Sequence, residues 1–498
     1  MRPGGPRRRG RRALGLWLAL LAAPAGAQVG QLSSQSLFYY QSANNFNGNY
    51  LAADGGAIYT NNAELTGSGS GETLLLAGLS GDTSRQGPRL DYHLDSNLAL
   101  LKYLKGSYPT RATGYLDGMA HLKIVPGFFQ WIARESYSQV QINPYTAATP
   151  ANLVSINTIT TGPRFTLRPT LRTSITLDAL YSYLTTSSAS SAYDNFDNHR
   201  YGGNLRIERA FSEAANLYLK GHYEKVDFKD QAANNNYSVA SGSAGYRLIN
   251  GRTVLDLSGG YSQVRVYDVV TEVAGAGGSR EGYKTTEEFN EPIWAVDISR
   301  LITPDQRVAL FGSQQFTDAA SAFRLGFDQA VPTVAPPQFA SGIVFKQQEV
   351  GLDWRLERPR TSIGVSLLAY RQRNLLETAT VNDRDVKTAV ATLARQLSPV
   401  LRADFGLSYE WQKQVGTPIS GTGQSAKVIG ALTDLNWQIG ERLALRFVYT
   451  YSKQIDAFSA NQIGVLASWA FVGAQQRMLQ AAPALTPISP ASTLSPYH

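Results

Sequence analysis

The sequence predicts an all-β protein, a closed up-and-down antiparallel transmembrane β-barrel of about 18 strands, within a range of roughly 16–20. Three observations lead to this prediction: an export signal, short turns that recur along the chain, and strands that alternate apolar and polar residues between them. The 26 Tyr, 19 Phe, 7 Trp and 45 Gly also suit many strands separated by turns, with aromatic side chains at the membrane interfaces.

Residues 1–27 have the three parts of a Sec-type signal peptide. Six arginines precede an apolar stretch at 13–22, and "AGA" at 25–27 supplies small residues for cleavage after position 27. The arginine pair at 11–12 leaves twin-arginine export as an alternative, although no other part of that motif follows. We therefore expect an exported protein of a Gram-negative bacterium.

The charge of the mature chain excludes some classes of partner. The formal net charge of +8 includes the six signal arginines, so the mature chain is close to neutral. A basic surface for nucleic acid is therefore not expected. The sequence has no cysteine, which excludes disulfides and cysteine-ligated metals. Beyond the signal, no apolar run approaches the roughly 18 residues that a transmembrane helix needs.

The chain after the signal divides into three parts. Residues 28–87 are expected to form an N-terminal periplasmic segment, and a weak pair of strands near 36–45 and 72–82 leaves open whether it adds to the barrel. The barrel itself is predicted over 88–471, with its first strand near 88–104. Residues 472–498 contain four prolines and no alternation, so they are expected to form a disordered periplasmic tail.

Short polar or proline-containing turns recur roughly 38 to 55 residues apart, as hairpins of an up-and-down barrel require. The predicted turns are 125–129, 168–173, 211–217, 249–254, 303–308, 357–362, 397–402 and 439–444. Longer polar connections fall between them, at 141–152, 185–196, 268–287 and 318–339. Strict alternation of short and long connections predicts short turns at the periplasmic end and long loops outside. The count gives an even number of strands, 18 or 20, as single-chain bacterial barrels require.

The strands have one apolar face and one polar face. In 401–411, apolar and aromatic residues alternate with Arg402, Asp404, Ser408 and Glu410, and segments 171–183 and 443–451 follow the same pattern. Lipid requires the apolar face, and a watery lumen accepts the polar one. Strands near 308–316 and 386–397 alternate poorly, so their registers are not fixed by pattern.

The segment "NQIGVLASWAF" at 461–471 is predicted to be the closing strand. Its alternation ends in Trp469 and Phe471, the type of strand end that the barrel-assembly machinery recognises. The alternative, an ordinary strand that happens to end in Phe, is disfavoured by the export signal and the even strand count upstream.

No catalytic, cofactor or metal site is predicted. His93 lies near Asp95 and Ser96, but residues 93 and 96 point to opposite faces of a strand, so a triad cannot form locally. Lys220, His222 and Glu224 share the inward face of one strand. This column is interpreted as solvated lumen wall, with a ligand or proton-relay role as the alternative.

The inward charges of the predicted strands are mixed in sign, which argues against a strongly ion-selective pore. The candidate lumen-lining residues are Arg172, Asp178, Arg206, Glu208, Lys220, His222, Glu224, Glu349, Asp353, Arg355, Arg402, Asp404, Glu410, Asp434, Arg442 and Arg446.

Three stretches carry a resemblance to a known family. "RLDYHLDSNLALLKY" (89–103), the run from "VPGFFQW" to "RFTLRP" (125–169) and "NHRYGGNLRIERAFSEAANLYLKGHYEKVDF" (198–228) resemble the outer-membrane barrels associated with PEP-CTERM/exosortase systems and exopolysaccharide operons. The resemblance covers most of the mature chain and includes no catalytic motif. It implies a channel or envelope component tied to polysaccharide export, with a periplasmic export protein and an exopolysaccharide chain as partners.

The expected function is accordingly a non-enzymatic outer-membrane channel for exopolysaccharide. A general or solute-specific porin and a structural barrel remain as alternatives. A receptor with an internal plug is disfavoured, because residues 28–87 are too few for a plug domain of about 100–150 residues.

Overall fold

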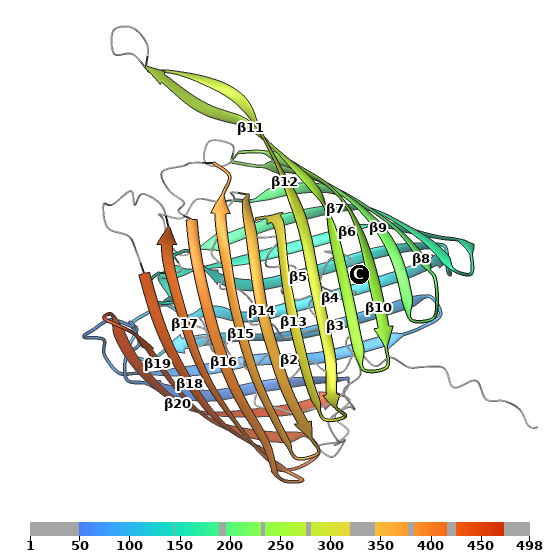
Figure 1. Ribbon diagram of the computed structural model, residues 1–498. Coiled ribbons are helices and arrows are strands. Elements are labelled where there is room, and N and C mark those ends of the chain that lie inside the picture. The colour runs from blue at the N-terminus through green and yellow to red at the C-terminus, as the bar shows by residue number, and fades with distance from the viewer. Residues whose placement is uncertain are drawn as a thin grey trace, which may run out of the picture.

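The computed structural model describes residues 49–143, 145–188, 196–230, 235–274, 280–318, 344–376, 383–415 and 425–472. Twenty strands there form one antiparallel sheet (Figure 1). The strands are β1 (Tyr50–Thr60), β2 (Glu72–Gln86), β3 (Leu90–Tyr103), β4 (Arg111–Val125), β5 (Phe129–Gln141), β6 (Leu153–Thr170), β7 (Thr173–Ser188), β8 (Asn198–Ala210), β9 (Ala215–Phe228), β10 (Tyr237–Asn250), β11 (Thr253–Ala274), β12 (Arg280–Thr303), β13 (Gln306–Thr317), β14 (Phe345–Arg358), β15 (Thr361–Asn374), β16 (Asp383–Ser398), β17 (Leu401–Val415), β18 (Ser425–Gln438), β19 (Leu443–Gln454) and β20 (Phe458–Val472). No helix within these ranges is long and apolar enough to cross a membrane.

The sheet closes on itself between its first and last strands. Each strand pairs with its neighbours in the chain, and β1 also pairs antiparallel with β20, from Thr60 opposite Gln462 to Leu51 opposite Val472. Closure leaves no free edge along this seam, which is the condition for a sheet in a membrane. The predicted closed up-and-down antiparallel barrel is confirmed, and its 20 strands lie at the upper end of the predicted range.

The barrel begins earlier in the chain than residue 88. Its first two strands are β1 and β2, whereas the sequence suggested a weak pair near 36–45 and 72–82. The second of these overlaps β2, but 36–45 lies outside the described residues and β1 comes later. β1 escaped detection because Asp54, Gly55 and Gly56 interrupt its alternation. The predicted signal peptide and residues 473–498 also lie outside the described ranges.

The two ends of the barrel differ in their connections. Nine turns of two to four residues join β2 to β3, β4 to β5 and so on to β18 and β19, and eight of them fall at the predicted turns. We call this end the short-turn end and the other the loop end. Strict alternation is wrong at one place, because β19 and β20 at the loop end are joined by only three residues.

The predicted long connection at 268–287 is corrected by the structure. β11 and β12 continue through most of it, pair from Val269 opposite Thr285 to Ala274 opposite Arg280, and project beyond the other strands as a two-stranded ribbon (Figure 1). The segment was missed because two valines are adjacent at 269–270 and 280–285 is mainly polar, so neither strand has the lipid-type alternation.

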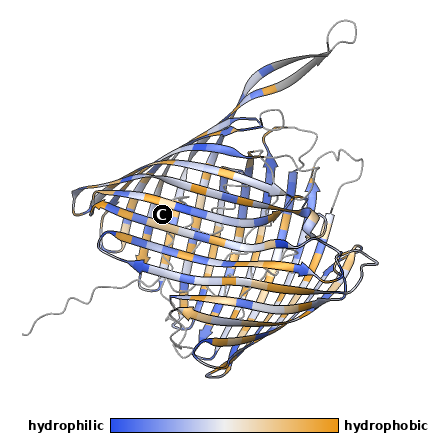
Figure 2. Ribbon diagram, turned by 180° about the vertical axis from the view of Figure 1, so that it is seen from behind, coloured by the Kyte–Doolittle hydropathy of each residue, from blue (hydrophilic) through white to orange (hydrophobic). Residues whose placement is uncertain are grey.

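The outer surface is apolar and the inner surface polar. On β17, Phe405 and Leu407 are 45% and 62% exposed, whereas Glu410 on the opposite face is 1% exposed. Figure 2 shows this alternation of apolar and polar residues along the strands. The exposed apolar side chains form the surface that lipid requires, and the polar residues face the lumen.

Candidate functional site: the polar lumen wall

Most of the predicted lumen-lining residues lie on strands, on the face opposite the exposed apolar side chains. Two do not. Arg172 lies in the turn between β6 and β7, and Arg442 lies in the turn between β18 and β19, where both are exposed. The alternation was extended one residue too far at each strand, because short polar turns continue the same pattern. These two arginines are therefore removed from the lumen wall.

On β17–β19 each inward arginine has a carboxylate partner. Arg402 Nη2 is 2.7 Å from Asp404 Oδ1 on the same strand. Arg446 on β19 is 2.5 Å from Asp434 on β18, and both side chains are almost fully buried. Charge therefore cancels at these two pairs, whereas Glu410 on the same face of β17 accepts a hydrogen bond from Gln412. We refer to β17–β19 as the paired wall.

Two other inward arginines follow the same rule. Arg164 binds Asp178 through two hydrogen bonds of 2.7 and 2.8 Å between β6 and β7. Arg355 Nε is 2.9 Å from Asp353 Oδ2 on β14. Glu349 instead accepts a hydrogen bond of 2.9 Å from Ser313. A carboxylate and a guanidinium at this distance neutralise each other and leave little field in the lumen.

On β8–β10 the pattern changes. Arg206 on β8 lies directly opposite Lys220 on β9 in the strand register, and both face the lumen. The guanidinium carbon of Arg206 is 4.7 Å from the centre of the Tyr218 ring, and Lys220 Nζ is 5.0 Å from the same centre. Arg206 Nε also donates to Glu208 at 3.0 Å. Two cations therefore share one aromatic ring. We refer to this region as the β8–β10 wall.

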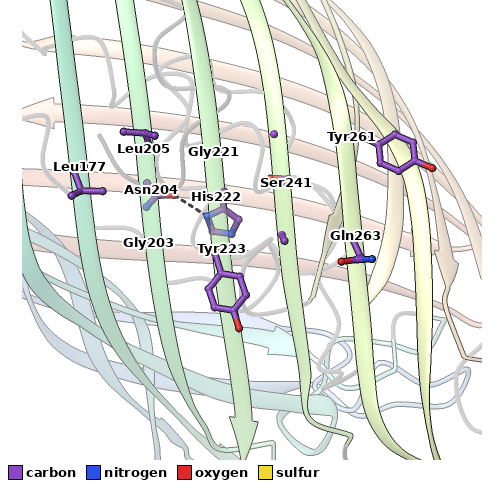
Figure 3. Close-up of a pocket in the computed structure, with 12 residues that line it drawn as sticks. Leu177, Gly203, Asn204, Leu205, Gly221, His222, Tyr223, Ser241, Tyr261 and Gln263 are labelled. Carbon is purple, nitrogen blue, oxygen red and sulfur yellow. Dashed lines mark hydrogen bonds between the residues drawn. The ribbon is translucent and has the colours of Figure 1, made fainter.

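A polar row lies next to this pair, toward the loop end. His222 Nδ1 is 2.8 Å from Asn204 Oδ1, and Ser241 on β10 lies opposite His222 (Figure 3). On the outer face, Gly203, Gly221 and Gly242 help to line a depression of about 530 Å³. Since these residues carry no side chain, only backbone separates the polar row from the outer surface here.

On the lumen side of the wall, a pocket of about 180 Å³ lies beside Asn204, His222 and Ser241. Its lining includes the Lys220–His222–Glu224 column together with Arg206 and Asn204. Further lining hydroxyl groups come from β10, β11 and β13: Ser241, Ser243, Ser258, Ser262 and Ser313. The structure thus brings the predicted column together with donors from four other strands. Polar groups from five strands therefore meet in this pocket.

A buried ion cluster above the pocket was missed by sequence reasoning. Arg200 on β8 is 1% exposed, and its Nη1 lies 3.1 Å from Glu224 and 3.3 Å from Asp318. Its Nη2 forms a further short hydrogen bond to Asp318. Asp318 follows β13, so this contact bridges strands that have β9–β12 between them. Only the folded register reveals such a pair, because no local pattern links residues on β8 and after β13.

The loop end of the lumen carries an apolar collar and a crossing loop. The collar consists of Val140, Val154, Ile156, Leu184, Phe196, Val226, Phe228, Tyr237, Val264, Val266, Val344 and Leu376. The loop between β5 and β6 reaches across to β19, where Gln454 donates a hydrogen bond of 3.0 Å to the carbonyl oxygen of Tyr145. Burial raises the pKa of the Tyr145 hydroxyl to about 12. The hydrogen bond holds the β5–β6 loop against β19 at this end of the barrel.

Trp469 and Phe471 lie near the end of β20, on its lipid-facing side, where they are 52% and 44% exposed. β1 begins beside them at the short-turn end. Their role as a barrel-assembly signal stays a prediction. Among the described residues, no group of His, Asp and Glu side chains is arranged to hold a metal ion.

A closed, even-numbered antiparallel sheet with an apolar exterior and a polar interior defines an outer-membrane β-barrel. No protein-family model and no curated protein matches this chain.

Solved structures with a similar barrel include three transport proteins. They are the FrpB iron transporter from Neisseria meningitidis (8% identity, 88% of this chain and 84% of that chain, TM-score 0.48), the copper transporter OprC (8%, 86% and 82%, 0.46) and the ferric-catecholate import receptor Fiu from E. coli K12 (10%, 84% and 81%, 0.44). At this level of similarity the likeness carries no argument about what this chain transports.

Proposed function

We propose that this barrel is a non-enzymatic channel that passes an exopolysaccharide chain across the outer membrane. The observation that carries the proposal is the local cancellation of charge along a polar inner face, seen at Arg402–Asp404 and Arg446–Asp434. A wall without net sign exerts little pull on small ions. It still offers many hydrogen-bonding groups to a hydrated sugar chain.

The polar groups between these ion pairs suit sugar hydroxyls. Thr392 and Gln396 on β16 and Thr450 on β19 lie on the inward side and are only half-buried, so a chain in the lumen can reach them. Hydroxyl and amide groups both donate and accept hydrogen bonds, as sugar hydroxyls do. Exchange among many similar contacts lets a chain advance without any single tight site. A periplasmic export protein would deliver the chain to the short-turn end.

A porin for small solutes is the second candidate, and one observation favours it. The β5–β6 loop contacts β19 across the mouth through Tyr145 and packs Ala147 against Leu65 and Phe458. A loop held in this way leaves less room for a polymer than for a small solute.

The deciding experiment is a deletion strain that carries wild type or an empty vector. We expect surface exopolysaccharide to fall strongly in the deletion strain and to return with wild type. Purified full-length protein in planar bilayers supplies the second measurement. Normal surface polysaccharide in the deletion strain, together with an open conductance, would replace the export proposal by the porin.

A further inference from the structure

The β8–β10 wall contains two neighbouring positive charges, and only one of them forms an ion pair within the described residues. Arg206 and Lys220 are direct cross-strand partners on the inward face. Like charges directly opposite each other on a sheet are destabilising. Glu208 compensates Arg206 at 3.0 Å, but no described residue forms a hydrogen bond or an ion pair with Lys220. One positive charge is therefore left over at this level of the lumen.

Unsatisfied donors gather around the same pair. Nη1 of Arg206 and Nδ2 of Asn204 are buried, and neither has a hydrogen-bond partner. Both residues line the pocket of about 180 Å³ together with Lys220. Each buried donor that forms no hydrogen bond costs about 1–3 kcal/mol of stability. An acceptor group that entered the pocket would remove this cost.

The surroundings fix the position of the two cations. Tyr218 lies beneath both, and its hydroxyl donates a short hydrogen bond to Asp256, which also binds Arg247 at 3.0 Å. Gly245 makes room for the ring, since a Cβ there would lie 2.2 Å from Tyr218 Cζ. The cations therefore rest on a braced aromatic platform. Ser243, which is opposite Lys220, adds a hydroxyl at the same level.

We propose that Lys220 and Arg206 bind the carboxylate of an acidic sugar residue, while Asn204 and the neighbouring serines contact its hydroxyl groups. A carboxylate offers acceptors to both cations at once and turns their repulsion into two charge-assisted contacts. The inference rests on the proposed channel function and names its substrate class: a polysaccharide that contains uronic acid residues. Binding is reversible and involves no covalent step.

The test is calorimetric titration of purified full-length protein with three probes: tetragalacturonate, the neutral maltotetraose and inorganic phosphate. Wild type should bind tetragalacturonate at least about tenfold more tightly than either other probe, since a charge-assisted hydrogen bond contributes about 1.5–3 kcal/mol. Lys220→Gln should lose about tenfold in affinity, and Lys220→Arg should retain most of it.

Arg172→Gln is the matched control, because Arg172 is an exposed cation in the turn between β6 and β7, outside the lumen wall. It should bind tetragalacturonate as wild type does. Heat-modifiable electrophoretic mobility verifies that each variant is folded, and Lys220→Met provides a second variant without the charge if the glutamine form fails to insert.

Equal binding of the acidic and neutral tetramers, or unchanged binding in Lys220→Gln, would overturn the site. Phosphate that binds as tightly as tetragalacturonate would overturn its assignment to a sugar. The deletion strain tests export separately: Lys220-dependent binding with normal surface polysaccharide would retain the site and reject the export function.

Discussion

The β8–β10 wall and the paired wall are built alike and differ in how their charges are satisfied. Both present apolar residues to lipid and a dense set of charges to the lumen. On the paired wall, Arg402 and Arg446 each bind a carboxylate within 2.7 Å. On the β8–β10 wall, Arg206 and Lys220 face each other across neighbouring strands. The two walls have similar residues, and the strand register decides which charges meet. It places carboxylates beside the arginines of the paired wall and one cation beside another on the β8–β10 wall.

The difference shows what each wall contributes. Ion pairs that are complete within the fold need nothing from a solute and cancel charge locally. A cation without an ion-pair partner in the described residues lowers the stability of the barrel when no solute is bound. Such a loss of stability is common where function requires a group that the fold does not need. Replacing the cation by methionine should therefore raise the free energy of unfolding at Lys220 and lower it at Arg402.

The largest effect is expected at the loop end of the β8–β10 wall, where the buried Arg200 binds two carboxylates. Arg200→Met leaves Glu224 and Asp318 buried without their cation, and we expect it to lower the free energy of unfolding by about 3–5 kcal/mol. Urea unfolding in lipid vesicles, followed by tryptophan fluorescence, measures this. Arg402→Met on the paired wall is the control and should lose less, because Arg402 is 25% exposed. Equal losses would contradict the view that Arg200 braces the lumen.

The platform beneath the two cations gives the next effect. Gly245→Ala places a Cβ against the Tyr218 ring and should cost about 1–3 kcal/mol, because an overpacked site must shift its side chains. The same unfolding assay measures the loss. Displacement of Tyr218 should also weaken tetragalacturonate binding. Gly242→Ala, where a Cβ would meet no atom within 4 Å, is the control and should leave binding unchanged.

Lys220→Met tests whether removing a cation without an ion-pair partner stabilises the barrel. It removes a charge that opposes Arg206, so the free energy of unfolding should rise by about 0.2–1 kcal/mol. Arg402→Met, which breaks an ion pair, should lower it. The urea midpoints of the two variants supply the measurement. A loss of stability in Lys220→Met would show that Lys220 contributes to the fold of the empty barrel.

The smallest effect lies outside both walls, in the turn between β12 and β13. Hydrogen bonds from Thr303 and Arg358 lower the pKa of Asp305 below its ordinary value. A lowered pKa in the folded state stabilises the protein above about pH 4, and this contribution is lost as the pH falls through the folded pKa. Asp305→Asn should therefore shift the urea midpoint slightly near neutral pH and not in acid. A shift of equal size at both pH values would contradict this.

The fold was largely predictable, because the period-2 pattern and the short turns have direct physical causes. The turns at 249–254 and 397–402, for example, contain the β10–β11 and β16–β17 connections. The ribbon of β11 and β12 was not predictable by the same rule, since strands outside lipid need no apolar face. β1 was missed for a similar reason, as two adjacent glycines hide its alternation.

The candidate site was only partly predictable. The inward column of Lys220, His222 and Glu224 follows from alternation alone. The juxtaposition of Arg206 with Lys220 needed the folded register, because counting outward symmetrically from the turn at 211–214 places Leu219 opposite Arg206. Contacts such as Arg200–Asp318 join strands that are far apart in the sheet, and no local pattern encodes them.

The ribbon formed by the ends of β11 and β12 has a consequence for proteolysis. Between 269–274 and 280–285 each strand pairs only with the other, because β10 pairs with β11 only as far as Val266 and β13 pairs with β12 only from Trp294 onward. Two strands alone in water are marginally stable, so they open locally without any change in the barrel. A protease added to intact cells should then cut here first. The two fragments would stay together as one nicked barrel, since the hydrogen bonds of β11 to β12 below the cut and the β1–β20 seam still hold them.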